Sequence, residues 1–104
     1  MKKLIPVMII LSLVLSLIQT YAERAAVLEG LGWIDALGNP AALLHCVLAY
    51  PTLDRHANLG AIAHLRMVFP DRVIGYSDHT LPGTMKVLET AFLLGARILE
   101  KHFT

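Results

Sequence analysis

The sequence has little charge, few aromatic residues and a single cysteine. Charged residues make up 16% of the 104 residues, and the formal net charge is only +1. Nucleic-acid-binding surfaces usually need basic residues clustered on one face, so this balance argues against a nucleic-acid partner. Cys46 alone cannot form an internal disulfide, and no paired cysteines offer a zinc site. Apolar residues make up 56% of the chain, so it can fold around a hydrophobic core.

The first 22 residues allow two interpretations, and the residues leave both open. Two lysines precede an apolar run over residues 4–18, and Ala22 offers a small residue where a signal peptidase could cleave. On this interpretation the chain is exported or membrane-anchored, although the run is short of the ~20 residues that span a membrane. Alternatively, residues 5–11 form a buried strand, because strands covered on both faces are continuously apolar.

The rest of the chain alternates between segments typical of strands and segments typical of helices. Helices are expected over residues 21–37, 58–68 and 85–94, and strands over residues 41–48, 72–76 and 96–99. Asn58 is expected to cap the second helix. This alternation predicts an α/β fold with a parallel sheet and right-handed crossovers. The chain can form only part of a (β/α)8 barrel, which typically needs about 250 residues.

Polar clusters follow the last two expected strands. Ser77, Asp78 and His79 follow one strand, and Glu100 and His102 follow the other. The chemistry of a β/α barrel is located where its strands end. We therefore expect His79 and His102 to lie close enough to share one divalent metal ion. On the residues alone, a turn or capping role for each histidine is the alternative.

Four other polar side chains are interpreted as structural. His45 lies inside an apolar strand and is expected to be buried and hydrogen-bonded. Cys46 is expected to be a small buried hydrophobe, since no activating base is evident nearby. His56 and His64 fall on a loop and a helix face and are expected to be solvated.

Several of these segments, taken together, closely resemble the sialic acid synthases, the family that includes N-acetylneuraminate synthase. The resemblance extends from about residue 41 to residue 104, and helix 21–39 fits more loosely. It rests on evenly spaced segments, namely Leu43-Leu44-His45-Cys46, Tyr50-Pro51-Thr52, Asn58-Leu59, Phe69-Pro70, Gly75-Tyr76-Ser77-Asp78-His79-Thr80, Leu94-Gly95-Ala96 and Glu100-Lys101-His102-Phe103-Thr104.

The resemblance implies a transferase with a TIM barrel, of which residues 23–104 form roughly the second half. The family condenses phosphoenolpyruvate with an N-acetylated amino sugar in carbohydrate biosynthesis. A divalent metal, manganese or magnesium, is held there by the histidines that match His79 and His102, and it polarises the sugar aldehyde. Ser77 matches a residue that helps hold phosphoenolpyruvate, and Tyr50 matches one near the ligands. The sequence neighbours of these residues, Asp78 and Glu100, are possible further members of the site.

The family also implies a homodimer acting on cytoplasmic sugars, which favours the strand interpretation of residues 1–22. The chain departs from the family pattern at Leu48, where a ligand-contacting serine or asparagine is common, at Leu53, where a second proline is common, and at residues 11–14, where a Ser-Thr-Gly turn is usual. The first half of the barrel is expected to be missing, with its lysines for phosphoenolpyruvate.

We therefore expect little or no synthase activity from the chain alone, and a need for the missing strands. The sequence does not identify the amino sugar. A function of another class stays open, namely a non-catalytic fragment or a small exported or membrane-associated protein.

Overall fold

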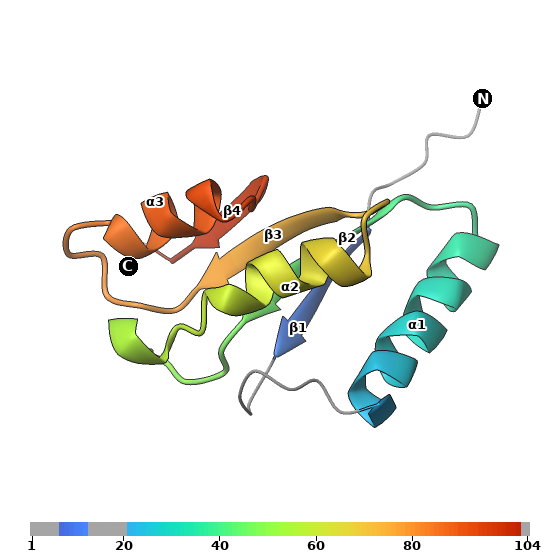
Figure 1. The fold of residues 1–104 in the computed structure, drawn as a ribbon, viewed down its shortest axis with the longest axis horizontal. Coiled ribbons are helices and arrows are strands. Elements are labelled where there is room, and N and C mark those ends of the chain that lie inside the picture. The colour runs from blue at the N-terminus through green and yellow to red at the C-terminus, as the bar shows by residue number, and fades with distance from the viewer. Residues whose placement is uncertain (1–6, 13–20, 103–104) are drawn as a thin grey trace.

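The computed structural model describes residues 7–12 and 21–102, which form one parallel sheet with helices between its strands (Figure 1). The strand order in the sheet is β1-β2-β3-β4, so each strand lies beside its successor. Parallel strands alternating with helices are the predicted α/β architecture, which is confirmed. The elements in chain order are β1 (Val7–Ser12), α1 (Tyr21–Ala36), β2 (Ala41–Cys46), the short 3-10 helix η1 (Asp54–His56), α2 (Gly60–Val68), β3 (Val73–Asp78), α3 (Lys86–Leu93) and β4 (Ile98–Lys101).

The first strand lies within the apolar run at the start of the chain. Strand β1 pairs in parallel with β2, from Val7 opposite Ala41 to Ser12 opposite Cys46. The other residues of that run, on which the signal-peptide interpretation depends, lie outside the described residues. Among the helices that the structure describes, none has both the length and the apolar character needed to span a membrane.

The ends of several elements differ from the predicted ones. Strands β3 and β4 extend to Asp78 and Lys101, so the first part of each polar cluster belongs to a strand rather than to the turn after it. The predicted cap at Asn58 is wrong, because α2 begins at Gly60 after Leu59 without a side-chain cap. Asn58 instead has a φ of 50°, the left-handed region that asparagine tolerates better than most residues.

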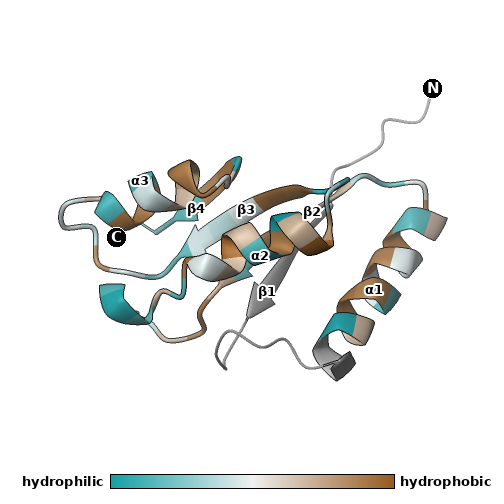
Figure 2. Cartoon of the chain, in the orientation of Figure 1, coloured by the Kyte–Doolittle hydropathy of each residue, from teal (hydrophilic) through white to brown (hydrophobic). Residues whose placement is uncertain are grey.

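The hydrophobic core lies between the helices and one face of the sheet. Helix α1 contributes Leu31, α2 contributes Ile62 and α3 contributes Ala91, and all three contact the same cluster. Since the three helices share one core, they cover one face of the sheet. Figure 2 shows apolar residues along α2 and in the first half of β3, with more polar residues towards the C-terminal end of β3. The sheet residues in this core are Leu43, Ile74 and Tyr76.

The opposite face of the sheet carries a different set of side chains. Successive residues of a strand point to opposite faces, and paired residues in neighbouring strands point to the same face. Cys46 pairs with Ser77, and Ser77 pairs with Glu100, so these three side chains lie on the face away from the helices. On the helix-covered face, His45 pairs with Tyr76. The sheet therefore separates two groups of polar residues near its C-terminal edge.

Candidate metal centre

Two histidines leave the sheet at the same edge. Asp78 lies opposite Lys101 where β3 and β4 end, so the next residues, His79 and His102, emerge side by side. Their imidazole centroids are 6.0 Å apart. His79 is half-buried and His102 is exposed, so the pair is accessible from outside. The expected juxtaposition of the two histidines is confirmed, while their role as metal ligands stays a prediction.

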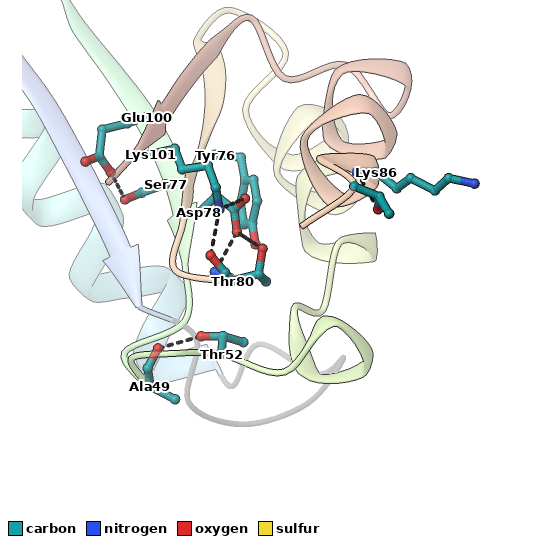
Figure 3. A network of polar contacts seen from close by, with 10 residues as sticks. Ala49, Thr52, Tyr76, Ser77, Asp78, Thr80, Lys86, Glu100 and Lys101 are labelled. Carbon is teal, nitrogen blue, oxygen red and sulfur yellow. Dashed lines mark hydrogen bonds and ion pairs between the residues drawn. The ribbon is translucent and has the colours of Figure 1, made fainter. Parts of the chain in front are cut away.

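Glu100 adds a carboxylate to the two imidazoles. His79, Glu100 and His102 each offer one ligand atom, and these atoms lie within 4.8 Å of one another. The Oε1 atom of Glu100 is 3.2 Å from Nε2 of His102, and its Oε2 atom accepts a hydrogen bond from the Ser77 hydroxyl (Figure 3). Imidazole nitrogen and carboxylate oxygen are ligands for divalent metal ions. The donor set therefore fits the ion that the resemblance implies.

Tyr50 forms an aromatic wall beside the histidines. It lies in the loop after β2, and its ring centroid is 5.2 Å from that of His79 and 5.5 Å from that of His102, in edge-to-face arrangements. Its side chain is exposed, so one side of the ring is free to contact a ligand. The pocket at this place is lined by Tyr50, Pro51, His79, Thr80, Leu81, Pro82 and His102.

Cys46 lies closer to the candidate centre than the sequence indicated. It is buried as expected, but its Sγ atom is 3.6 Å from Nε2 of His79, so the expectation of no nearby base is wrong. Burial raises the pKa of this thiol, the hydrogen bond with Ser77 opposes that effect, and the negative charge of Glu100 adds to it. The thiol is therefore neutral at pH 7. Cys46 comes close to His79 because it pairs with Ser77 and therefore lies on the same face of the sheet as Ser77, a register that the sequence alone does not fix.

Asp78 does not join the histidines. Its carboxylate lies on the helix-covered face, where it accepts hydrogen bonds from Lys101, Tyr76 and Thr80. Figure 3 shows this group and the Ser77–Glu100 pair on opposite sides of β3. Burial raises the Asp78 pKa, but the hydrogen bonds from Lys101 and Thr80 outweigh that effect and hold it below its usual value. Sequence reasoning missed Lys101, because the pairing of Asp78 with Lys101 depends on the register between β3 and β4.

His45 holds the loop that carries Tyr50. Its Nε2 atom donates a hydrogen bond to the Ala57 carbonyl at 2.8 Å, and its ring stacks on Tyr76 with centroids 5.6 Å apart. The expectation of a buried, hydrogen-bonded histidine is confirmed. Burial lowers the His45 pKa, so the ring stays neutral near pH 7. Of the two histidines expected to be solvated, His56 is exposed and His64 is half-buried.

Neither loop position that departs from the family pattern is buried. The side chain of Leu48 is 67% exposed and that of Leu53 is 46% exposed. Both lie in the segment between β2 and α2, which also carries Tyr50. Both leucines therefore lie on the surface of that segment and outside the hydrophobic core.

Parallel strands that alternate with helices and end in polar side chains at one edge of the sheet are the arrangement of the β/α barrel fold. The chain belongs to the NeuB family, whose model matches residues 6–104. It is 43% identical over 84 residues to the spore coat polysaccharide biosynthesis protein SpsE of Bacillus subtilis, covering 80% of this chain and 22% of that protein. It is 51% identical over 63 residues to the N-acetylneuraminate-9-phosphate synthase of Drosophila melanogaster, covering 61% and 16%.

Solved structures agree with this assignment. A crystal structure of a spore coat polysaccharide biosynthesis protein E from Chromobacterium violaceum matches with a TM-score of 0.79 and 31% identity, covering 93% of this chain and 26% of that one. The N-acetylneuraminic acid synthetase of Leptospira borgpetersenii, solved with citrate, matches with a TM-score of 0.66 and 34% identity, covering 84% and 28%. The fold thus matches part of the TIM barrel of these synthases, and the chain spans between 16% and 28% of the length of the relatives named here.

Proposed function

We propose that this chain contributes the metal-binding part of the active site in a sugar-acid synthase that condenses phosphoenolpyruvate with an N-acetylated amino sugar. The observation that carries the proposal is the cluster of His79, Glu100 and His102, with ligand atoms within 4.8 Å of one another. Membership of the NeuB family supports the class of reaction. Relatives named as N-acetylneuraminate-9-phosphate, legionaminic acid and pseudaminic acid synthases support a sugar acid as the product class.

In this proposal His79 and His102 hold manganese or magnesium, with Glu100 as a further or water-bridged ligand. A cation held there would supply Lewis-acid polarisation of the sugar aldehyde. Ser77 orients Glu100 through its hydrogen bond. Tyr50 covers one side of the imidazole pair and restricts how a ligand approaches.

The proposal is tested by titrating the 104-residue chain with Mn²⁺ and following free Mn²⁺ by electron paramagnetic resonance. We expect weak binding at one site, because three side chains leave several coordination positions to water. His79→Ala and His102→Ala should each abolish most of this binding. His56→Ala, an exposed histidine on η1, is the matched control and should bind as the unchanged chain does. Unchanged affinity in both His79→Ala and His102→Ala would overturn the proposed centre.

The reaction class is tested by a chimera with a longer relative. The matched 63 residues of the Drosophila synthase are replaced by the corresponding residues of this chain, and product formation is assayed. We expect measurable synthase activity, which the additional change His102→Ala should remove. A folded, metal-binding chimera that forms no product would argue against this reaction while leaving the metal centre intact.

A further inference from the structure

A buried ion pair lies directly behind the candidate metal centre. The Nζ atom of Lys101 is 2.8 Å from Oδ2 of Asp78, and the two side chains are 3% and 1% exposed. Lys101 also donates to the Thr80 carbonyl at 2.6 Å. The other carboxylate oxygen of Asp78 accepts from the Thr80 backbone N–H at 2.8 Å, from the Thr80 hydroxyl at 2.7 Å and from the Tyr76 hydroxyl at 3.3 Å. Burying an ion pair is favourable only when such additional hydrogen bonds satisfy it.

The members of this network adjoin both histidines along the chain. His79 lies between Asp78 and Thr80, and His102 directly follows Lys101. The network therefore fixes the backbone on both sides of His79 and on the N-terminal side of His102. The side chains of Asp78 and Lys101 point towards the helices. The residue that follows each of them, His79 or His102, is therefore directed to the opposite face, where Glu100 lies.

The same network reaches the loop that carries Tyr50. Thr80 forms an isolated parallel bridge with Thr52, whose N–H donates to the His79 carbonyl at 2.8 Å. The Thr52 hydroxyl in turn donates to the Ala49 carbonyl at 2.5 Å, next to Tyr50 (Figure 3). These hydrogen bonds thus constrain the backbone next to each of the three rings of the centre.

We infer that Asp78, Lys101 and Thr80 are positioning residues that set the spacing and direction of His79 and His102 for a shared cation. The inference rests on the proposed function, because it assigns the network a role towards the same centre. None of the three side chains needs to touch the metal or a substrate. Their effect is to hold two ligands from separate strands in one geometry before the ion arrives. Partners that orient metal ligands typically change metal affinity by about 10- to 100-fold when removed.

The test removes the ion pair while leaving the histidines in place. The double change Asp78→Asn/Lys101→Met keeps the side-chain sizes similar and avoids leaving one buried charge unpaired. We expect its Mn²⁺ affinity to fall about 10- to 100-fold relative to the unchanged chain. Nuclear Overhauser contacts between the rings of His79, His102 and Tyr50, recorded without metal, should weaken in parallel.

A second ion pair provides the matched control. Asp35 and Arg72 form a bidentate pair with distances of 2.9 and 2.5 Å between α1 and the residue before β3, at the other end of that strand. Asp35→Asn/Arg72→Met removes as many charges and should leave both the Mn²⁺ affinity and the ring contacts unchanged. Equal losses in both double variants would overturn the inference, because they would indicate a general loss of stability.

The threonine offers a milder variant in case the double change prevents folding. Thr80→Val keeps the shape and the ion pair but removes the hydroxyl that donates to Asp78, and Thr80→Ser restores it. We expect a smaller loss of affinity in the valine variant and recovery in the serine variant. If Mn²⁺ affinity and ring contacts stay unchanged in Thr80→Val and in a folded Asp78→Asn/Lys101→Met variant, this inference is overturned while the proposed function stands. An unchanged chain that binds no Mn²⁺ would overturn the proposed function, and the metal-free ring contacts would then decide whether the network positions the histidines.

Discussion

Glu100 connects Ser77 to His102 where strands β3 and β4 end, because one carboxylate oxygen accepts from the serine hydroxyl and the other lies 3.2 Å from the imidazole Nε2. The carboxylate is thereby held in one orientation beside both histidines. Its position in β4 directly opposite Ser77 in β3 explains the contact. The geometry predicts that Glu100 and Ser77 act together on any bound cation.

Glu100→Gln should weaken Mn²⁺ binding more than Ser77→Ala does. The glutamine keeps the shape and an oxygen that Ser77 can contact, but it removes the negative charge that a hard cation prefers. The alanine leaves the charge and removes only its orienting partner, for which we expect a loss of about 10-fold. Isothermal titration with Mn²⁺ measures both. Glu89→Gln, an exposed change on α3, is the control, and the opposite ranking of the two variants would contradict this role for Glu100.

Acid should destabilise the fold through His45. Burial lowers the pKa of this histidine below 6.5, so the unfolded chain binds a proton more readily than the folded one. The contribution to stability is complete above pH 6.5 and is lost as the pH falls from there through the folded pKa. His45→Gln, which cannot titrate but keeps an N–H donor, should remove this part of the pH dependence of the unfolding free energy. Urea denaturation across that range measures it, and the exposed His56→Gln should leave the pH dependence unchanged.

Gly75→Ala should separate β3 from β4. A Cβ atom at residue 75 would lie 2.6 Å from the Ile98 carbonyl oxygen, and backbone atoms cannot give way cheaply. We expect a loss of about 1–3 kcal/mol in unfolding free energy, the usual range for overpacking. Gly60→Ala is the control, because nothing lies within 4 Å of its added Cβ. Equal stability of the two variants in urea denaturation would show that the strands can move apart without cost.

The sequence was sufficient to predict the alternation of strands and helices, because apolar runs and helical spacing follow from local burial. It was also sufficient to predict that His79 and His102 meet, since each follows a parallel strand with one helix between them. The side of the sheet that each polar residue occupies could not be read reliably. That assignment depends on where β3 ends, and the strand continues through Ser77 to Asp78 instead of stopping at Tyr76.

The partner of Asp78 was missed for the same reason. The motif around Asp78 suggested that this residue belongs to the site of the two histidines. Strand alternation instead directs its carboxylate away from Ser77 and towards Lys101. The capping role expected of Asn58 failed because the loop before α2 needs a residue with positive φ there, which takes its side chain out of the capping position. Residues whose roles depend on cross-strand register or on unusual backbone angles are those that the pattern of residue types leaves undetermined.

Asp78→Asn should lower the stability of the chain near pH 7 and have progressively less effect in acid. The variant leaves Lys101 buried without its counter-charge, for which we expect a loss of about 3–5 kcal/mol at neutral pH. Hydrogen bonds from Lys101 and Thr80 hold the folded pKa of Asp78 below 3.8, even though burial acts in the opposite direction. Its contribution to stability is therefore present above pH 3.8 and is lost as the pH falls through the folded value.

The difference in unfolding free energy between the unchanged chain and the Asp78→Asn variant should accordingly narrow below that pH. Urea denaturation from about pH 7 to about pH 2 measures this difference at each step. Asp71→Asn, an exposed carboxyl in the turn before β3, should show no such pH-dependent difference. A gap between the unchanged chain and Asp78→Asn that stays constant into strong acid would mean that the Asp78 carboxylate is not charged in the folded chain. The ion pair behind the histidines would then not exist as described.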